Sequence, residues 1–284
     1  MSITEIQEGV NHNFVLRSIT GNTYFIKKQK PISLPLKNPL KMLNWHIANS
    51  WFRSPHLSHM IILPRPYSQQ ELQKELLTWR LWKEAGIPVL EYHCVVPQTY
   101  TIAWKFKENC ISFSTLLNQP GTFYNEFEMV LTLFEKLQKL AFQHHDSNYM
   151  HSDPTLQNFL YDPQKKRVYP IDSAVVMDTR IGIEKLNIFS INLFLGSILK
   201  LNQPDYIVRK YVRQLANHLS PKDAQNLYEF KRQYSFLGQW YYRLRNFRQQ
   251  KLKKITDSNT YCEEDIIFNQ RFTNCAADIL KERF

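Results

Sequence analysis

The sequence predicts an α+β fold with a small β-rich N-terminal lobe that carries one long helix, followed by a larger helical C-terminal lobe. Three observations lead to this prediction: strand-like segments in the N-terminal part, a well-delimited helix between them, and helical periodicity in most of the C-terminal part. With 284 residues, of which 43% are apolar, the chain can bury a sizeable core. Its 14% of aromatic residues exclude an intrinsically disordered protein.

Alternation and turn signals predict the strands of the N-terminal lobe. Residues 4–28 are expected to form a hairpin, because apolar and polar side chains alternate on both sides of a Thr-Gly-Asn turn signal. Two more strands are expected near 89–96 and 99–106. The proline-rich residues 29–66 form an irregular insertion after the hairpin, although positions within 40–52 have the spacing of a helix that packs on the core.

Residues 68–85 give the clearest helix signal in the chain. Ser68 and Glu71 match a capping box, and a glycine followed by a proline ends the helix. Glu75 falls on the same side of this helix as its apolar stripe. A carboxylate on the buried side costs free energy unless a cation or a hydrogen-bonding group lies against it. We therefore expect Glu75 to have such a partner.

The C-terminal lobe is predicted to be helical around one polar loop. A short helix precedes a longer one over 125–145, whose apolar positions recur at helical spacing. A loop rich in His, Asp and Asn follows at 146–158, then two short strands joined by a turn, then helices over most of 183–284. The longest apolar run, 188–199, is too short and too polar to span a bilayer, and therefore predicts a buried helix.

The segment 150–175 contains the residues that indicate a chemistry. His151, Asp153 and Asn158 lie in the polar loop, and Asp172 follows the second predicted strand. Phosphoryl transfer needs a carboxylate that orients the attacking hydroxyl and accepts its proton, and an amide and a second carboxylate that hold Mg²⁺ on the phosphates. The spacing brings these three oxygen-bearing side chains to one cleft. In the alternative interpretation, Asp153 is a loop or helix cap and Asn158 is a turn residue.

This segment resembles the catalytic and metal-binding loops of the protein-kinase-like superfamily. It is most similar to the H-G-D-x4-N pattern of the bacterial lipopolysaccharide-core and Kdo sugar kinases, the aminoglycoside and choline phosphotransferases, and the atypical kinase subunit of the tRNA-threonylcarbamoylation complex. Upstream, TYFIKK (23–28) resembles the strand that carries the phosphate-contacting lysine. QKELLTWRLWKEAGIPV (73–89) resembles the helix whose glutamate pairs with that lysine. The resemblance spans residues 8–175, and the remainder matches only in being helical.

The resemblance implies a bilobal protein-kinase-like fold. Residues 1–108 would form the nucleotide-binding lobe, with the insertion between the lysine strand and the pairing helix. Residues 109–284 would form the helical lobe with the catalytic and metal-binding loops. Within that lobe, the resemblance implies that Asp153 is the catalytic carboxylate and that Asn158 and Asp172 bind the metal ion.

The resemblance also assigns the nucleotide-binding residues. It implies that Lys27 contacts the phosphates of ATP, that Glu75 pairs with Lys27, and that Gly9 is what remains of a glycine-rich phosphate loop. Strand alternation places Lys27 and Lys28 on opposite faces. Periodicity does not decide between the two lysines, and only the family spacing favours Lys27. His151 is expected to support the loop by hydrogen bonding and not to act as an acid or base.

Three departures from the family pattern are visible. Gly9 stands alone where relatives have several glycines, Ser152 replaces the usual Gly or Arg, and Asp172 is followed by Ser-Ala in place of Phe-Gly. The lysine, the glutamate, the catalytic aspartate and both metal-binding residues are nevertheless all present. We therefore favour an active enzyme over a pseudokinase.

The charge of the chain favours an anionic partner. The formal net charge is +11 and the pI is about 9.4. Residues 231–254 carry eight Lys/Arg and no acid, interleaved with aromatic residues, which suits an anionic lipid surface or RNA. The alternative is an amphipathic helix with an aromatic core face. The four cysteines form no CxxC pair, and the N-terminus has no signal-peptide pattern, so we expect a protein of a reducing, cytoplasmic compartment.

These observations together predict an enzyme that uses ATP and Mg²⁺ to phosphorylate a hydroxyl group. By resemblance, the acceptor is a sugar of a lipopolysaccharide-type glycolipid, an anionic substrate at the inner membrane surface. The enzyme would be cytoplasmic and without a transmembrane segment, with peripheral attachment to the inner face of the cytoplasmic membrane left open. The alternatives are a protein Ser/Thr kinase, a kinase associated with a tRNA complex and, from another class, a nucleotide-binding pseudokinase scaffold.

Overall fold

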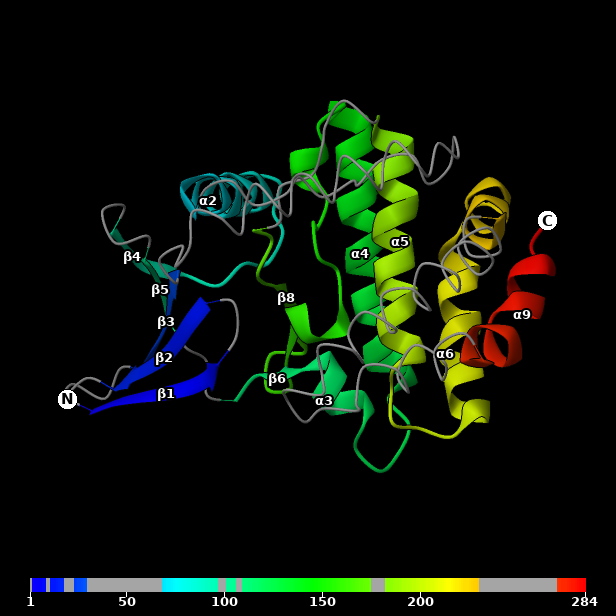
Figure 1. Ribbon diagram of the computed structural model, residues 1–284, viewed down its shortest axis with the longest axis horizontal. Coiled ribbons are helices and arrows are strands. Elements are labelled where there is room, and N and C mark those ends of the chain that lie inside the picture. The colour runs from blue at the N-terminus through cyan, green and yellow to red at the C-terminus, as the bar shows by residue number, and fades with distance from the viewer. Residues whose placement is uncertain are drawn as a thin grey trace, which may run out of the picture.

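The computed structural model confirms the predicted α+β class (Figure 1). It describes residues 2–8, 11–17, 23–29, 68–96, 101–105, 109–174, 182–229 and 270–284. Gly9, the helical spacing at 40–52 and the basic aromatic stretch 231–254 lie outside the described residues, as does nearly all of the proline-rich insertion.

The N-terminal part forms a five-stranded antiparallel sheet in the order β1-β2-β3-β5-β4. Its strands are β1 (Ser2–Glu8), β2 (Asn11–Arg17), β3 (Thr23–Gln29), β4 (Tyr92–Val96) and β5 (Thr101–Lys105). The sequence predicted one hairpin over 4–28, whereas the structure has three strands there, because β1 also pairs with β2. β4 and β5 lie within the two segments predicted as strands. The central position of β3 places its residues next to β5, far along the chain.

Helix α2 (Ser68–Glu84) lies between this sheet and the helices of the C-terminal part (Figure 1). Gly86 follows the end of this helix, and its φ of +69° is the left-handed conformation that favours glycine after a helix. The indole nitrogen of Trp79 donates to the Leu90 carbonyl at 2.7 Å, and that of Trp82 donates to the Tyr149 carbonyl at 2.7 Å. One helix is thus fastened to both parts of the molecule. The side chains of the predicted capping box at its start lie outside the described residues.

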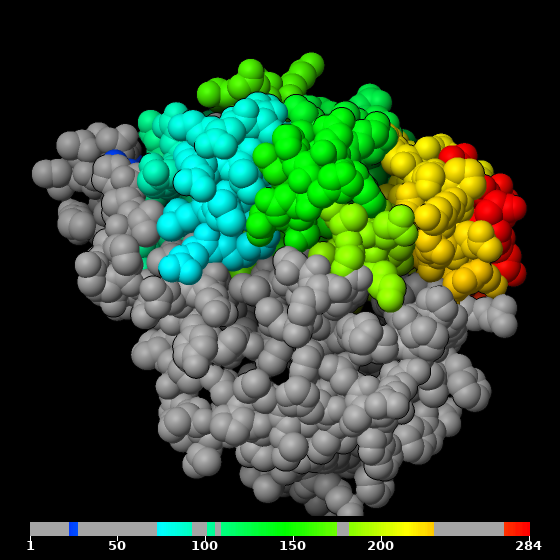
Figure 2. All heavy atoms as spheres, turned by 90° about the horizontal axis from the view of Figure 1, so that it is seen from above, coloured from blue at the N-terminus to red at the C-terminus, as the bar shows by residue number. Residues whose placement is uncertain are grey.

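The main core is formed by the helices of the C-terminal part: α3 (Phe113–Leu117), α4 (Tyr124–His144), α5 (Ile183–Leu199), α6 (Asp205–His218), a helical stretch over 221–229 and α9 (Ala277–Lys281). Every apolar position predicted for helix 125–145 is buried. The rings of Phe134 on α4 and Phe194 on α5 stack at 4.6 Å with an interplanar angle of 12°. Figure 2 shows α2 and the residues of 113–150 side by side on one face, with α6 and α9 beyond them.

The C-terminal segment is anchored to this core by Arg271. Its guanidinium donates to the carbonyls of Leu199 and Gln203 at 3.1 and 2.8 Å, and it pairs with Asp205 at 3.2 Å. Carbonyls at the end of a helix have no partner within the helix, so this arginine satisfies the end of α5.

A second, three-stranded sheet positions the polar loop. It consists of β6 (Ile111–Ser112), β7 (Phe159–Asp162) and β8 (Arg167–Pro170), paired antiparallel in that order. Two short 3-10 helices, η2 (Ser147–Tyr149) and η3 (Leu156–Asn158), lead into it. The β7–β8 hairpin matches the two short strands that the sequence predicted, and it returns the chain to the loop just before Asp172.

The structure also bears on the expectations for membrane-spanning helices, for the apolar run 188–199 and for the cysteines. Within the described ranges, no helix combines the length and the apolar character needed to cross a membrane. The run 188–199, predicted as a buried helix, lies within α5 and contributes several residues to the core. Cys110 and Cys275 are free thiols.

Candidate active site

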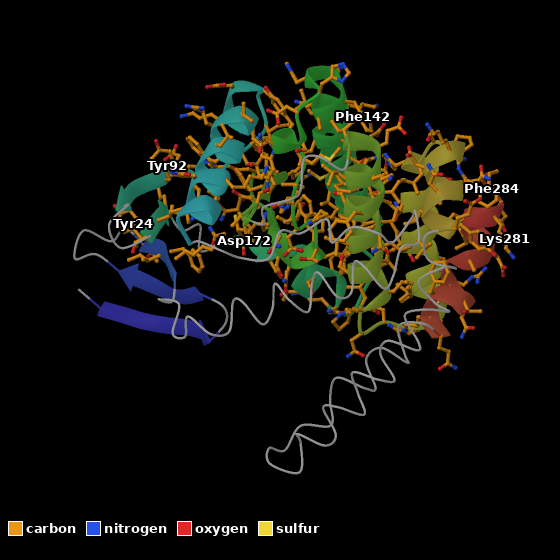
Figure 3. All side chains as sticks on the ribbon, turned by 45° about the horizontal axis from the view of Figure 1, so that its top comes forward. Tyr24, Tyr92, Phe142, Asp172, Lys281 and Phe284 are labelled. Atoms are coloured by element: carbon orange, nitrogen blue, oxygen red, sulfur yellow. The ribbon has the colours of Figure 1, made fainter. Side chains whose placement is uncertain are left out.

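Lys27 lies at the centre of a cluster of charges in which Lys27 and Glu75 are buried and Asp172 is partly exposed. It projects from β3 and is 6% exposed, and its Nζ donates to Glu75 Oε2 of α2 at 2.9 Å. The same Nζ also contacts Asp172 Oδ1, two residues beyond β8. Figure 3 shows Asp172 where the sheet and α2 meet the helical part. The contact between Lys27 and Glu75 that the resemblance implies is therefore present.

The two carboxylates keep Lys27 charged. Burial by itself would lower the pKa of this ammonium group, because it penalises the charged form. The negative charges of Glu75 and Asp172 outweigh that effect and raise the pKa above its ordinary value of 10.5. Glu75, which is 5% exposed, thus has the cationic partner that its position on the buried side of α2 required.

Asp153 and Asn158 lie against each other at the polar loop. The amide nitrogen of Asn158 donates to the Asp153 carbonyl at 2.8 Å and to Asp153 Oδ2 at 3.0 Å. Burial raises the pKa of the Asp153 carboxyl, and the neighbouring Asp172 carboxylate raises it further. The hydrogen bond from Asn158 and the charge of Lys27 act in the opposite direction. Asp153 thus combines a fixed orientation with an increased affinity for a proton.

His151 supports the loop from within the core. It is 1% exposed, and its ring lies 5.4 Å from the ring of Trp82 and 5.0 Å from that of Phe159. Burial lowers its pKa to about 4, so the ring is neutral near pH 7. Its Nδ1 accepts a hydrogen bond from the Asp153 N–H at 3.2 Å. This geometry agrees with the supporting role expected from the sequence.

Asp172 is held in an unusual backbone conformation. Its φ of +56° is in the left-handed region, which is uncommon for a residue with a Cβ atom. The preceding residue, Ile171, donates its N–H to the Asn158 carbonyl at 2.9 Å. This hydrogen bond ties the backbone of one predicted metal-binding residue to that of the other.

The side chains of Asn158 and Asp172 suit a hard divalent cation. Because the amide nitrogen of Asn158 donates to Asp153, its acceptor atom is Oδ1, and Asp172 supplies carboxylate oxygen. Oxygen ligands are the ones that Mg²⁺ prefers, and Mg²⁺ usually takes only one or two ligands from the protein and the rest from phosphates and water. Among the described residues, no three His, Cys, Asp or Glu side chains are grouped to hold a metal ion by themselves. These residues therefore fit a metal ion that is bound together with a phosphate group.

Lys74 and Ser173 are two residues near the site that sequence reasoning did not single out. Lys74 donates to Asn148 Oδ1 at 2.7 Å, and Ser173 bonds to Ser152. A signal for Lys74 was available, since it stands one helical turn before Thr78 and therefore on a buried side of α2. The signal for Ser173 was the departure from Phe-Gly after Asp172.

Comparisons with known proteins identify kinases of low similarity. No family model matches the chain, and no curated protein matches it either. Among solved structures, the choline kinase LicA from Streptococcus pneumoniae has 12% identity and a TM-score of 0.44, over 99% of this chain and 94% of that one. A choline/ethanolamine kinase family protein from Mesorhizobium loti has 12% identity and a TM-score of 0.44, over 99% and 88%.

A third solved structure is WaaP in complex with acyl carrier protein, with 12% identity and a TM-score of 0.38, over 89% of this chain and 88% of that chain. At these identities and TM-scores, neither the substrates nor the partners of these proteins are transferred to this chain. The interpretation of the site therefore depends on its own geometry.

Proposed function

We propose that this protein is an ATP-dependent phosphotransferase that moves the γ-phosphate of ATP to a hydroxyl group. The observation that carries the proposal is the contact of the buried Lys27 with both Glu75 and Asp172, beside the hydrogen-bonded pair of Asp153 and Asn158. A buried ion pair contributes little to stability by itself. Phosphoryl transfer, in contrast, needs a held cation, a positioned carboxylate and oxygen ligands for a metal ion.

In this proposal, Lys27 binds the α- and β-phosphates and Glu75 holds the ammonium group in place. Asn158 and Asp172 are the residues that would hold Mg²⁺, which would neutralise charge on the phosphates. The contact between Lys27 and Asp172 keeps the ammonium group of Lys27 near the carboxylate that would bind the metal ion. The ammonium group and Mg²⁺ would therefore meet the same phosphate chain. Residues 1–108 and 109–284 would act as the nucleotide-binding lobe and the catalytic lobe.

Asp153 would act on the acceptor. Its carboxylate orients the hydroxyl and takes the proton as the acceptor oxygen forms a bond to the γ-phosphorus. The bond between the γ-phosphorus and the bridging oxygen breaks at the same time, and ADP leaves with the electron pair. A raised pKa makes the Asp153 carboxylate a better proton acceptor than an exposed aspartate. The hydrogen bond from Asn158 holds it in one orientation.

We further propose that the acceptor is a sugar hydroxyl of a lipopolysaccharide-type glycolipid. The support is the resemblance of the segment 150–175 to the kinases of such sugars, and the net charge of +11, which favours an anionic substrate at a membrane surface. The enzyme would work in the cytoplasm, at the inner face of the cytoplasmic membrane.

The test is phosphate transfer from γ-labelled ATP to glycolipids, free sugars, a tRNA complex and generic proteins, with Asp153→Asn beside the wild type. We expect transfer to the glycolipid. We expect Asp153→Asn to lower kcat by a factor of roughly 10² or more while the affinity for ATP stays nearly unchanged.

Asp162→Asn is the matched control for this test. Asp162 is also buried, but its carboxylate accepts from the N–H groups of Gln164 and Lys165 in the β7–β8 turn, a role that asparagine can fill. This variant should retain activity. Turnover by Asp153→Asn at the wild-type rate would rule out the assignment of the catalytic carboxylate.

A further inference from the structure

Two buried serines join the loop of Asp153 to the segment of Asp172. Ser152 and Ser173 are 1% and 2% exposed. The N–H of Ser152 donates to Ser173 Oγ at 3.1 Å, and the two hydroxyl oxygens lie 3.1 Å apart, within hydrogen-bond distance. These serines occupy two of the positions at which the sequence departs from the protein-kinase-like pattern. The two departures thus contact each other.

The position of each serine connects this contact to the chemistry. Ser152 immediately precedes Asp153, and Ser173 immediately follows Asp172. Asp172 has a left-handed backbone, which must be stabilised by its surroundings to persist. The structure supplies a hydrogen bond on each side of it: the Ile171 N–H donates to the Asn158 carbonyl before it, and Ser173 Oγ accepts from the Ser152 N–H after it.

We propose that Ser173, with Ser152 as its partner, is a positioning residue that sets the placement of Asp172 relative to Asp153. The hydroxyl of Ser173 touches neither a phosphate nor the acceptor in this proposal. It acts by holding the backbone of a metal-binding carboxylate against the loop of the catalytic one. The inference rests on the proposed function, because the placement of Asp172 relative to Asp153 matters only if Asp172 helps to hold Mg²⁺ on ATP while Asp153 acts on the acceptor hydroxyl.

The side chains of the two serines make different numbers of hydrogen bonds, so their removal should have different effects. Ser173→Ala removes the acceptor of the Ser152 N–H and the contact between the hydroxyls, whereas Ser152→Ala removes only the contact between the hydroxyls. The backbone N–H remains in Ser152→Ala and can still donate to Ser173. Ser173→Ala should therefore be the more harmful change, and the double variant should resemble Ser173→Ala.

The experiment uses titration calorimetry to measure the Mg²⁺ concentration that gives half-maximal ATP binding. It compares the wild type with Ser152→Ala, Ser173→Ala and the double variant. We expect Ser173→Ala to raise this concentration roughly tenfold, as loss of a group that supports a metal ligand does. We expect Ser152→Ala to raise it by only about threefold, for loss of one hydrogen bond. Ile279→Val, a small core deletion in the remote helix α9, controls for lost stability and should leave this concentration unchanged.

A second readout separates positioning from general destabilisation. In the absence of nucleotide, hydrogen exchange at the Ser152 amide should accelerate in Ser173→Ala and stay slow in Ser152→Ala. An unchanged Mg²⁺ requirement in a folded Ser173→Ala, or a larger effect of Ser152→Ala, would overturn the positioning role. An increase of equal size in Ile279→Val would overturn it too. Failure of the wild type to bind ATP at any Mg²⁺ concentration would instead overturn the proposed function, and the positioning role with it.

Discussion

Lys27 and Lys74 are both lysines in largely buried surroundings, yet their surroundings act on them in opposite directions. Around Lys27, two carboxylates outweigh the cost of burial and raise the pKa above 10.5. Around Lys74, burial prevails and lowers the pKa to about 8, because the nearest partner, Asn148, is neutral and only the charge of Asp146 opposes the shift. Their partners in the structure, Glu75 and Asn148, differ accordingly in charge.

This difference supports the proposal that Lys27, and not Lys74, binds phosphate. Burial lowers the pKa of Lys74 to about 8, so its ammonium group gives up a proton more readily than that of an exposed lysine. A lysine that must meet the charge of a nucleotide has to stay protonated, and a pair of carboxylates ensures this for Lys27. The adjacent residues Lys74 and Glu75 thus fasten α2 in two ways, one to the polar loop and one to the sheet.

The largest expected effect comes from breaking the cluster at Lys27. Lys27→Met should lower the free energy of unfolding by about 3 kcal/mol, because it leaves the buried Glu75 without this cation. Glu75→Gln should also reduce stability and activity strongly. The double variant should cost little more than the worse single one, since the two residues act as a unit. Urea unfolding of the three variants measures this coupling.

Lys28→Met is the control for Lys27→Met, because strand alternation puts residue 28 on the opposite face of β3. It should be nearly silent in stability and activity. If Lys28→Met were the damaging change, the assignment of the phosphate-contacting lysine would be wrong by one position.

A smaller effect is expected from Lys74→Met. At pH 7, the free energy of unfolding of this variant should be lower than that of the wild type by no more than about 1 kcal/mol. The variant loses the hydrogen bond to Asn148, but it also no longer has to bury the charge of Lys74. Between pH 8 and 10.5, the unfolded chain binds a proton at Lys74 that the folded chain does not. The stability of the wild type should therefore rise with pH in this window relative to that of Lys74→Met. Equal pH profiles would contradict the lowered pKa.

The smallest effect concerns a third cation, His218 of α6, which lies nearer the surface. Its ring contacts Glu128 at 2.6 Å and Glu135 at 3.0 Å, both on α4. Burial lowers the pKa of this imidazole, but the hydrogen bonds to Glu135 and Glu128 outweigh it and raise the pKa above 6.5. The stabilisation should be complete below pH 6.5 and be lost as the pH rises through the higher folded-state pKa.

The comparison of wild type with His218→Gln at pH 5.5 and pH 9 tests this. At pH 5.5, the variant should be less stable than the wild type by at most about 1 kcal/mol, because solvent screens the charges of His218 and the two glutamates. At pH 9, this difference in the free energy of unfolding should be smaller. A difference that grew with pH would contradict the predicted sign.

Much of the fold was predictable because it follows from local sequence patterns, namely the spacing of apolar residues and the turn signals. The spacing of apolar residues located α4 and the burial of α5, and the turn signals located the β7–β8 hairpin. The need of Glu75 for a partner followed from its position on α2 alone. The proximity of Asp153 and Asn158 followed from their separation by five positions in one loop.

Other features depend on contacts that a linear pattern does not encode. β1 was missed because its two apolar residues, Ile3 and Ile6, stand three positions apart and so do not alternate with polar residues as in a regular strand. The contact of Lys27 with Asp172 joins β3 to the segment after β8, 145 positions further along the chain. The bond between Ser152 and Ser173 joins positions 21 residues apart, where the sequence showed only two separate departures from a family pattern.

The most direct test of the central claim is the affinity for ATP in the presence of Mg²⁺, measured by calorimetry for wild type, Lys27→Met and Lys74→Met, with far-UV circular dichroism confirming that each variant is folded. We expect Lys27→Met to weaken binding at least about tenfold, as loss of a charge-assisted contact does. We expect Lys74→Met to change binding by no more than about twofold, because Lys74 donates to Asn148 of the polar loop and is not part of the Lys27 cluster. Wild-type affinity in a folded Lys27→Met, or a greater loss in Lys74→Met, would contradict the claim that the Lys27 cluster binds ATP.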